Sequence, residues 1–393
     1  MKRGLEGGCG ALARLFGPWR VWAGLLLLLG GALILLGASC EAAAGAAAGL
    51  DKGELDVLFW NVQALFDGEE SGSEYLDYME TAGWSAEKYR ARITAMAKGI
   101  SQIPSGFPDI LALAEIENPQ TLLDMAESLA SLGGSQARYR YSSFANVSGM
   151  SLGLGILSKI PLVQQRAHSF TAENETTPRP VAEVWVEAEG IPLALFICHW
   201  KSKLGGDEKT EGQRRASARL ILRRLREIEA ETPGTPVLIM GDLNENHDEY
   251  YRQAGRYICA LLPDDPKAAH HAGLARDGGA EAGSVQTDFL VLSGNKPPRS
   301  AYFAEGTAAL YSPWGKELKG GSYFYSNDWE TIDHFLLNSA LFDGQGWEFE
   351  GGETLRVEPF VNAQGTPNLY SIRTGGGLSD HLPLRLSLKL LSP

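Results

Sequence analysis

Eight short apolar runs of strand length recur along the chain, and helix-like segments separate several of them. The runs are Leu55–Trp60, Ile110–Ala114, Leu152–Leu157, Val181–Val186, Leu193–Cys198, Val237–Met240, Ile332–Leu337 and Leu384–Leu388. Apolar runs of this length are typical of buried strands. Strands that alternate with helices along the chain predict an α/β fold.

Two segments carry the apolar period of a helix. In the first, Ser85 is placed to cap a helix whose apolar positions run over residues 89–100. The second has apolar side chains on one face over residues 218–228 and Arg219, Arg223 and Arg226 on the other. We interpret these arginines as a solvated outer face rather than a nucleic-acid contact.

The first 40 residues have the organisation of an export signal. A basic start precedes an apolar run over residues 21–36 that is interrupted by glycines. A membrane span needs about 20 apolar residues, so this shorter run is more typical of a signal peptide. An Ala- and Gly-rich tether over residues 41–53 follows. We expect residues 54–393 to form a single domain, with insertions between core strands around 250–321.

Small residues stand directly before Cys40, as at the processing site of a bacterial lipoprotein. This pattern predicts that Cys40 becomes the acylated first residue and ties the body to a membrane, on the periplasmic side or at the cell surface. The alternative is an ordinary signal peptide that is cut in the following Ala-rich stretch and releases a secreted protein. Both alternatives predict export.

Net charge and cysteine content exclude some modes of nucleic-acid binding and of metal binding. The formal net charge is −13, and it becomes −16 without residues 1–40, which hold four basic residues and one acid. This charge argues against a protein that holds DNA through a broad basic surface, and it favours a soluble monomer. Only Cys198 and Cys259 fall in the body, and no zinc-type cysteine spacing occurs. A metal site would therefore use oxygen ligands and histidine.

Polar clusters follow or interrupt the apolar runs at repeated positions. They are Asn61, Glu115, His199 with Lys201, Asp242 with Asn244, Asp333 with His334, and Ser379 with Asp380 and His381. Strand ends at one edge of a sheet are where α/β folds gather ligands and catalytic groups. Each cluster alone is compatible with an ordinary strand end or turn. Together, carboxylates, amides and imidazoles at successive strand ends predict a site for metal-assisted hydrolysis.

The residue types fit that chemistry. Mg²⁺ prefers carboxylate and amide oxygens and keeps several waters, so Glu115 with Asn61 nearby would suffice as protein ligands. A carboxylate such as Asp242 can orient or deprotonate an attacking water. A histidine paired to a carboxylate becomes a tuned base or charge stabiliser, and Asp333 with His381 is the candidate pair.

Six ordered motifs resemble those of the endonuclease/exonuclease/phosphatase superfamily. They are Phe59-Trp60-Asn61-Val62, Ala114-Glu115-Ile116-Glu117-Asn118, His199-Trp200-Lys201-Ser202-Lys203, Gly241-Asp242-Leu243-Asn244, Thr331-Ile332-Asp333-His334 and Ser379-Asp380-His381-Leu382-Pro383. The resemblance covers nearly the whole chain from Leu55 to Leu388. It implies a DNase I-like four-layer sandwich, in which two packed mixed β-sheets are flanked by helices, with the site where the loops of the two sheets meet.

The same resemblance implies a metal-dependent phosphoric-ester hydrolase. Glu115 would be the metal ligand with support from Asn61, and Asp380 would be a further ligand or charge partner. The expected ion is Mg²⁺, with Mn²⁺ and Ca²⁺ as alternatives.

Catalytic roles follow from the resemblance as well. His199 and His381 would flank the scissile phosphate, and Asp242 and Asn244 would position water and phosphate. Asp333 would orient His381. Either Asp242 or His381 could take the proton of the water, and the sequence leaves both open.

Two basic residues are candidates for substrate binding. Arg179 precedes a strand and resembles the phosphate-side arginine of the superfamily. Lys201 would provide local positive charge beside His199, together with Lys203. Each is equally compatible with a solvated surface residue.

The motif style is most similar to secreted bacterial nucleases, so nucleic acid, DNA or RNA, is the expected substrate. One alternative is a phosphoesterase for a lipid or an inositol phosphate, such as a sphingomyelinase-like enzyme. Its lipid-facing loop would expose aromatics such as Tyr302-Phe303, Trp314 and Tyr323-Phe324-Tyr325, which could equally stack on bases or pack the core. A second alternative is a surface lipoprotein that binds without turnover.

Overall fold

The computed structural model describes residues 53–169, 171–172, 175–176, 179–274, 287–298 and 307–391. The expected signal peptide over residues 1–40 and nearly all of the tether lie outside these ranges, as does Tyr302-Phe303. Each of the eight apolar runs coincides with a strand, although Leu152 and Ile332 precede their strands by one residue, and both expected helices are present. In the described part of the chain, no helix combines the length and apolar character needed to cross a membrane.

The first sheet has six strands in the order β17-β18-β1-β2-β4-β3. In chain order they are β1 (Glu54–Leu65), β2 (Ile110–Ile116), β3 (Tyr141–Ala145), β4 (Gly153–Ser158), β17 (Gly346–Thr354) and β18 (Leu384–Leu391). β1 and β2 are parallel, and the other neighbours are antiparallel. The N-terminal and C-terminal strands of the domain therefore lie side by side in its centre.

The second sheet has eight strands in the order β11-β12-β13-β16-β10-β9-β8-β5. They are β5 (Leu162–His168), β8 (Val181–Ala188), β9 (Ile191–His199), β10 (Val237–Asp242), β11 (Leu261–Pro263), β12 (Leu290–Ser293), β13 (Ala309–Tyr311) and β16 (Asp333–Leu337). The region around 250–321, expected as insertions, adds β11, β12 and β13 to this sheet. Its strands have only three or four residues each, which is why no alternation was visible in the sequence.

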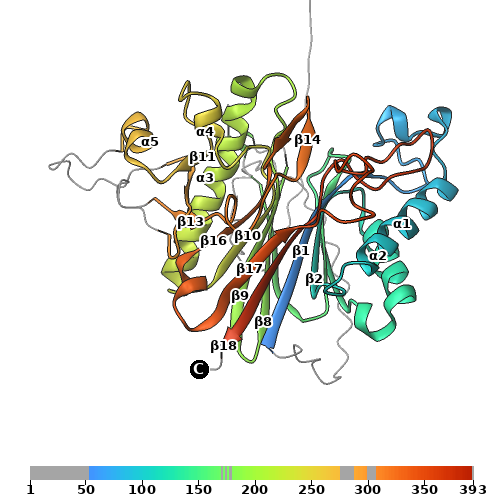
Figure 1. Cartoon of the computed structure of the whole chain (residues 1–393), viewed down its shortest axis with the longest axis horizontal. Coiled ribbons are helices and arrows are strands. Elements are labelled where there is room, and N and C mark those ends of the chain that lie inside the picture. Colours follow the sequence, from blue (N-terminus) through green and yellow to red (C-terminus); the bar gives the residue numbers. More distant parts are fainter. Residues whose placement is uncertain are drawn as a thin grey trace, which may run out of the picture. The chain divides into compact units, whose positions relative to one another are not determined.

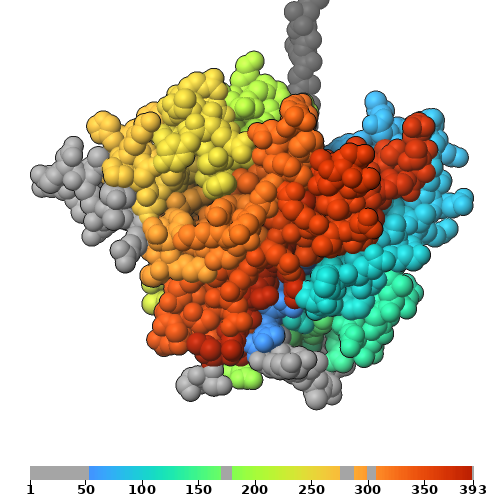
Figure 2. Space-filling model, viewed as in Figure 1, coloured from blue at the N-terminus to red at the C-terminus, as the bar shows by residue number. Residues whose placement is uncertain are grey.

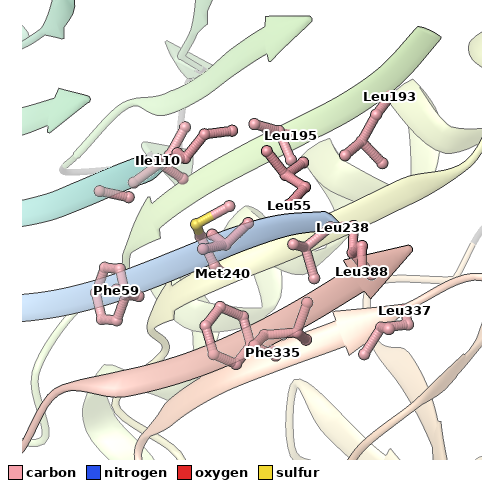
Figure 3. Close-up of a cluster of buried hydrophobic side chains, with 14 of the residues drawn as sticks. Leu55, Phe59, Ile110, Leu193, Leu195, Leu238, Met240, Phe335, Leu337 and Leu388 are labelled. Carbon is pink, nitrogen blue, oxygen red and sulfur yellow. The ribbon is translucent and has the colours of Figure 1, made fainter. Parts of the chain in front are cut away.

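The two sheets pack face to face through a continuous apolar layer (Figure 3). Leu195, Met240 and Phe335 of the second sheet meet Leu55 and Phe59 of the first, and all five side chains are fully buried. Burial of apolar surface stabilises a fold by about 25 cal/mol per Å², so this layer is a main source of stability.

Helices cover the outer faces (Figure 1). α1 (Ala86–Ser101) and α2 (Pro119–Gly133) pack on the first sheet, and α3 (Asp207–Glu231) packs on the second. This arrangement of helix, sheet, sheet and helix confirms the expected four-layer α/β sandwich. The exposed Arg223 lies near Glu227 on α3, in agreement with a solvated outer face.

Shorter elements complete the described chain. They are 3-10 turns at Leu76–Tyr78, Glu80–Ala82, Gly134–Ala137 and Ser339–Phe342, the helices α4 (Glu249–Arg252) and α5 (Pro266–His271), and the two-stranded pairs β6 (Thr171–Ala172) with β7 (Glu175–Thr176) and β14 (Tyr323–Tyr325) with β15 (Asp328–Glu330). On the face shown in Figure 2, the orange and red C-terminal part of the chain lies between the blue and cyan N-terminal part and the yellow central part.

Helix caps explain where two of the helices begin. The Ser85 side chain accepts a hydrogen bond from the backbone N–H of Lys88, as the sequence predicted. Helix α2 was not predicted, although its start carries a clear signal. Asn118 accepts from the backbone N–H of Thr121, and Pro119 occupies the first helical position, where its missing N–H costs nothing.

We expect Leu195→Ala to lower the free energy of unfolding by about 2–5 kcal/mol, because it opens a cavity between the two sheets. Urea unfolding followed by tryptophan fluorescence measures the effect. Leu132→Ala, on the exposed surface of α2, is the matched control and should change stability by less than about 0.5 kcal/mol. Equal losses in the two variants would contradict a core between the sheets.

Candidate active site

A cavity of about 620 Å³ lies where strand ends of both sheets meet. Its lining residues are Glu115, Arg179, His199, Ser202, Lys203, Leu204, Gly205, Asp207, Asp242, Asn244, Tyr323, Tyr325, Glu330, Ile332, Asp380 and His381. Seven of the ten residues expected from the sequence belong to this set. Two more, Asn61 and Asp333, lie directly behind it in hydrogen-bond contact with lining residues. The tenth, Lys201, does not line the cavity.

Strand register places three polar side chains in a row across the second sheet. His199 at the end of β9 is the register partner of Asp242 in β10, and Asp242 is the partner of Asp333 in β16. Directly opposed residues on neighbouring strands project to the same face of a sheet. The three side chains therefore reach the same edge of the sheet without any help from loops.

Close packing of β9 and β10 requires a glycine before Asp242. A Cβ atom at Gly241 would lie 2.2 Å from the carbonyl oxygen of Cys198, far inside any allowed contact. The glycine of the Gly241-Asp242-Leu243-Asn244 motif is thus a steric requirement for the approach of the two strands. Cys198 itself is a fully buried free thiol.

The pair Asp333 and His381 forms as the sequence predicted. His381 Nδ1 donates to Asp333 Oδ2 at 2.7 Å, and Ser322 Oγ donates to the same oxygen at 2.5 Å. Ser379 Oγ accepts from the His381 backbone N–H at 3.1 Å and donates to the Asn61 carbonyl at 2.7 Å. The imidazole is thereby fixed, and its Nε2 lies 3.9 Å from Asp242 Oδ2.

Asn61 connects the two sheets at the floor of the cavity. Its Nδ2 donates to Glu115 Oε1 at 3.2 Å within the first sheet and to Asp242 Oδ2 at 3.0 Å in the second. His199 Nε2 lies between the same two carboxylates, 3.6 Å from Glu115 Oε1 and 3.5 Å from Asp242 Oδ2. One amide and one imidazole therefore separate two carboxylates that would otherwise repel each other.

Burial and neighbouring charge give the two histidines opposite protonation preferences. Burial opposes a charge on His381, but the Asp333 and Asp380 carboxylates outweigh it and hold the pKa of His381 well above its ordinary value. Burial, with the Arg179 and His381 cations, holds the pKa of His199 well below its ordinary value. Burial and the Asp333 carboxylate raise the pKa of Asp242 to about 7. The site thus pairs a cationic imidazole with a neutral one.

Asn244 and Arg179 converge on one backbone carbonyl. Asn244 Nδ2 donates to the Trp200 carbonyl at 3.1 Å, and Arg179 Nη1 donates to the same oxygen at 2.6 Å. Asn244 has a left-handed φ of 52°, and its N–H donates to Asp242 Oδ1 at 2.9 Å, closing an Asx-type turn. The Asn244 amide and the Arg179 guanidinium are therefore neighbours, and both residues belong to the cavity lining.

The lysines differ from the expectation. Lys201 Nζ contacts the Ser202 hydroxyl at 3.3 Å and lies outside the cavity lining. Lys203 lines the cavity instead, where it pairs with Glu249 at 2.7 Å and lies 3.8 Å from Glu330. The two lysines are two residues apart on an irregular loop, so the sequence pattern could not distinguish which one faces inward.

The donor set at the cavity fits a hard divalent cation. Glu115, Asp242 and Asp380 bring three carboxylates to the lining, and such oxygens are the ligands Mg²⁺ prefers. Asp242, Asp333 and His381 also form a buried cluster whose candidate ligand atoms lie within 4.8 Å of one another. The Asp333 Oδ2–His381 Nδ1 contact is already used by a hydrogen bond, so Glu115 with Asn61 and Asp380 is the better-placed ligand group.

His334, next to Asp333 in the sequence, does not join the cavity lining. It is fully buried, and its Nε2 lies 2.7 Å from the Glu245 carbonyl. Burial lowers its pKa to about 4, so it packs as a neutral core side chain.

Sequence reasoning missed Arg92, a fully buried arginine on α1. Its guanidinium donates to the carbonyls of Val62 and Gln63 at 2.6 Å each and to that of Ala64 at 3.1 Å. Gln63 and Ala64 form a left-handed bulge in β1, with φ of 55° and 50°. The bulge aims the Ala64 N–H at Glu115 Oε2, 2.6 Å away. Arg92 therefore positions Glu115 through the bulge. Its place on the buried face of an amphipathic helix was the one available signal.

The sequence was compared with protein families and with curated proteins. The sequence profile of the Endonuclease/Exonuclease/phosphatase family matches residues 56–256. No curated protein matches the chain in sequence.

Solved structures give low-identity matches across most of the chain. A truncated TDP2 from Caenorhabditis elegans is 16% identical, covers 86% of this chain and 97% of its own, and has a TM-score of 0.47. TDP2 of D. rerio, solved with a single-strand DNA product, is 16% identical, with coverage of 86% and 99% and a TM-score of 0.46. An endonuclease/exonuclease/phosphatase family protein from Bacteroides thetaiotaomicron is 14% identical, with coverage of 86% and 98% and a TM-score of 0.45.

We expect Arg92→Met to weaken Mn²⁺ binding by about 10- to 100-fold, because the bulge that orients Glu115 loses its support. Isothermal titration calorimetry measures the affinity, with urea unfolding measured in parallel. Arg224→Met is the matched control. Arg224 is a buried arginine of α3 that pairs with Glu183 at 2.8 Å and does not line the cavity. If both variants lose stability but neither loses affinity, Arg92 has no positioning role.

Proposed function

This chain belongs to the endonuclease/exonuclease/phosphatase family, and from that premise we propose that it is a divalent-metal-dependent phosphodiesterase that hydrolyses nucleic acid. The observation that carries the proposal is the convergence of Glu115, His199, Asp242 and His381 on one cavity, from strand ends of both sheets. Two carboxylates, a cationic imidazole and a neutral imidazole around a common space are suited to phosphoryl transfer to water.

Metal binding is assigned to Glu115, with Asn61 and Asp380 as supporting groups. A bound Mg²⁺ would polarise a phosphoryl oxygen and stabilise charge that develops there, and Mn²⁺ or Ca²⁺ are alternatives with the same ligand preference. The Glu115 carboxylate is held in position by two hydrogen bonds, which the Ala64 N–H and Asn61 Nδ2 donate to it. Hydrogen bonds donated to a metal-ligating carboxylate by neighbouring groups keep it in one orientation.

Four side chains of the cavity have distinct roles in the proposed reaction. Asp242, held by Asn61 and by the Asn244 N–H, orients the attacking water and accepts its proton. His381, fixed by Asp333, donates from Nε2 to the phosphoryl group as negative charge develops. His199 supplies a second hydrogen-bond donor from the other side of Asp242. Arg179, beside Asn244 in the cavity lining, contacts a phosphate oxygen of the substrate.

The cavity gives less support to the hypothesis that this chain is a non-catalytic surface-binding protein. Nine of the ten expected residues lie on the cavity or directly behind it, and each has hydrogen-bond or close charge contacts within the site.

A lipid phosphodiesterase is the second candidate. Its supporting observation is the strong exposure of Leu204 (84%) and Tyr325 (61%) among the lining residues, since exposed apolar side chains can enter a membrane surface.

We expect Glu115→Gln to lower kcat for DNA or RNA hydrolysis by about 10²-fold or more, because the amide is a poorer ligand for a hard cation. The assay offers plasmid DNA, single-stranded DNA, RNA, sphingomyelin and a soluble inositol phosphate to the chain without residues 1–40. Each substrate is combined with Mg²⁺, Mn²⁺, Ca²⁺ or a chelator.

The matched control is Glu117→Gln, two residues further along, where the side chain is buried and lies outside the cavity lining. It should retain nearly full activity. Hydrolysis of nucleic acid that persists in chelator, or in Glu115→Gln, would contradict the mechanism. Hydrolysis of a lipid or inositol phosphate alone would keep the site and replace the substrate.

The proposal includes export and membrane attachment. The basic start, the apolar run over residues 21–36 and the small residues before Cys40 support cleavage at this cysteine and its acylation. The body would then act as a monomer tied to a membrane by the tether over residues 41–53.

We expect cells that express the chain to incorporate labelled palmitate into it, and Cys40→Ser to abolish the incorporation and move the protein from the membrane fraction to the soluble fraction. Cys259→Ser is the matched control, because Cys259 is buried in the folded body and should not affect labelling. A wild-type chain that takes up no label would overturn the lipoprotein assignment.

A further inference from the structure

Two tyrosines of β14 form a stacked pair beside the catalytic groups. Tyr323 and Tyr325 alternate with Phe324, so their rings lie on the same side of the strand. Their ring centroids are 6.3 Å apart and the ring planes differ by 13°. Tyr325 is 61% exposed, whereas Tyr323 is partly buried. Both line the cavity.

The pair continues directly from His381. The Tyr323 ring centroid lies 4.7 Å from that of His381, with an angle of 33° between the rings, and the two residues form a backbone bridge. An aromatic surface thus extends from the imidazole assigned to the scissile phosphate outward to solvent. In Figure 1, β14 lies at the end of the sheets, beyond the end of β10.

The other side of the β14–β15 hairpin holds it in place. Phe324 packs on Trp329 with ring centroids 5.1 Å apart, and the Arg356 guanidinium lies 3.8 Å from the centroid of the Trp329 ring. Arg252 donates to the Trp329 carbonyl at 3.3 Å and to Asp328 Oδ2 at 3.2 Å. The two tyrosines are therefore presented from an anchored strand, which lowers the entropy cost of binding a ligand to them.

Charge at the cavity favours a ligand held by more than its phosphates. The chain carries a net charge of −13, and Lys203 in the lining is paired with Glu249. Proteins that bind nucleic acid through counterion release need several unpaired cations along the strand. Stacking on aromatic rings supplies affinity that does not depend on net charge, and it requires a base that is not stacked in a duplex.

We propose that Tyr323 and Tyr325 form a stacking shelf for the nucleobase next to the scissile phosphate, which makes single-stranded nucleic acid the substrate class. This inference rests on the proposed phosphodiesterase function. A duplex keeps its bases inside, so its phosphates can reach the cavity without any contact between a base and the shelf. A single strand can place one base against Tyr325 while its phosphate contacts His381.

The test compares KM for a single-stranded oligonucleotide with KM for an oligomer of equal charge that has abasic sites next to every phosphate. The wild-type full chain should show a KM about 5- to 100-fold lower for the oligonucleotide. Tyr325→Ala should remove this difference, and Tyr325→Phe should retain it because the ring is kept. Tyr251→Ala is the matched control, since Tyr251 is 50% exposed but outside the cavity lining.

The outcomes separate the inference from the function on which it rests. Cleavage of both oligomers with equal KM, unchanged in Tyr325→Ala, would overturn the shelf and leave the phosphodiesterase intact. Cleavage of neither, with hydrolysis of sphingomyelin in vesicles that Tyr325→Ala abolishes, would overturn both and assign the tyrosines to a membrane surface. If Tyr251→Ala also removes the difference between the KM values for the two oligomers, the effect is a general loss of structure, and the shelf is overturned as well.

Discussion

The register of β9, β10 and β16 is the constraint on which the site depends. Because His199, Asp242 and Asp333 are directly opposed on three neighbouring strands, one set of backbone hydrogen bonds fixes all three side chains at once. A shift of one residue would turn each of them to the other face of the sheet. Gly241 secures this register, since no larger residue fits against Cys198.

Several carboxylates share one buried region, and burial of an unpaired charge is costly. The molecule limits this cost by giving each carboxylate donors of its own. Glu115 accepts from a backbone N–H and from an amide, and Asp242 accepts from Asn61 and Asn244. Asp333 accepts from Ser322 and from a histidine. The hydrogen bonds that offset the cost of burying these carboxylates also fix the orientation of their side chains.

The sequence predicted the α/β class and eight of the strands, and nine of the ten residues that it singled out lie on or directly behind the cavity. It succeeded there because apolar runs and the polar residues that end them are local patterns. It failed where the determinant was distant. The inward position of Lys203 instead of Lys201 depends on its ion pair with Glu249. The role of Arg92 depends on the bulge at Gln63 and Ala64, which lie 29 and 28 residues earlier in the chain. The strands β11, β12 and β13 are too short to show alternation.

The hydrogen bond from Asn61 to Asp242 joins the two halves of the sandwich at the site itself. Away from the site, the contact between the sheets is mainly an apolar layer (Figure 3), to which the hydrogen bond from Trp347 Nε1 to the Ile191 carbonyl is added at 3.3 Å. Apolar contacts have no preferred direction, whereas a hydrogen bond weakens steeply when its length or angle departs from the optimum. A displacement of one sheet against the other would therefore separate Glu115 from Asp242, which Asn61 now bridges, while the strands of each sheet stayed paired. Assembly of the cavity thus depends on the alignment of the two sheets as well as on the folding of each.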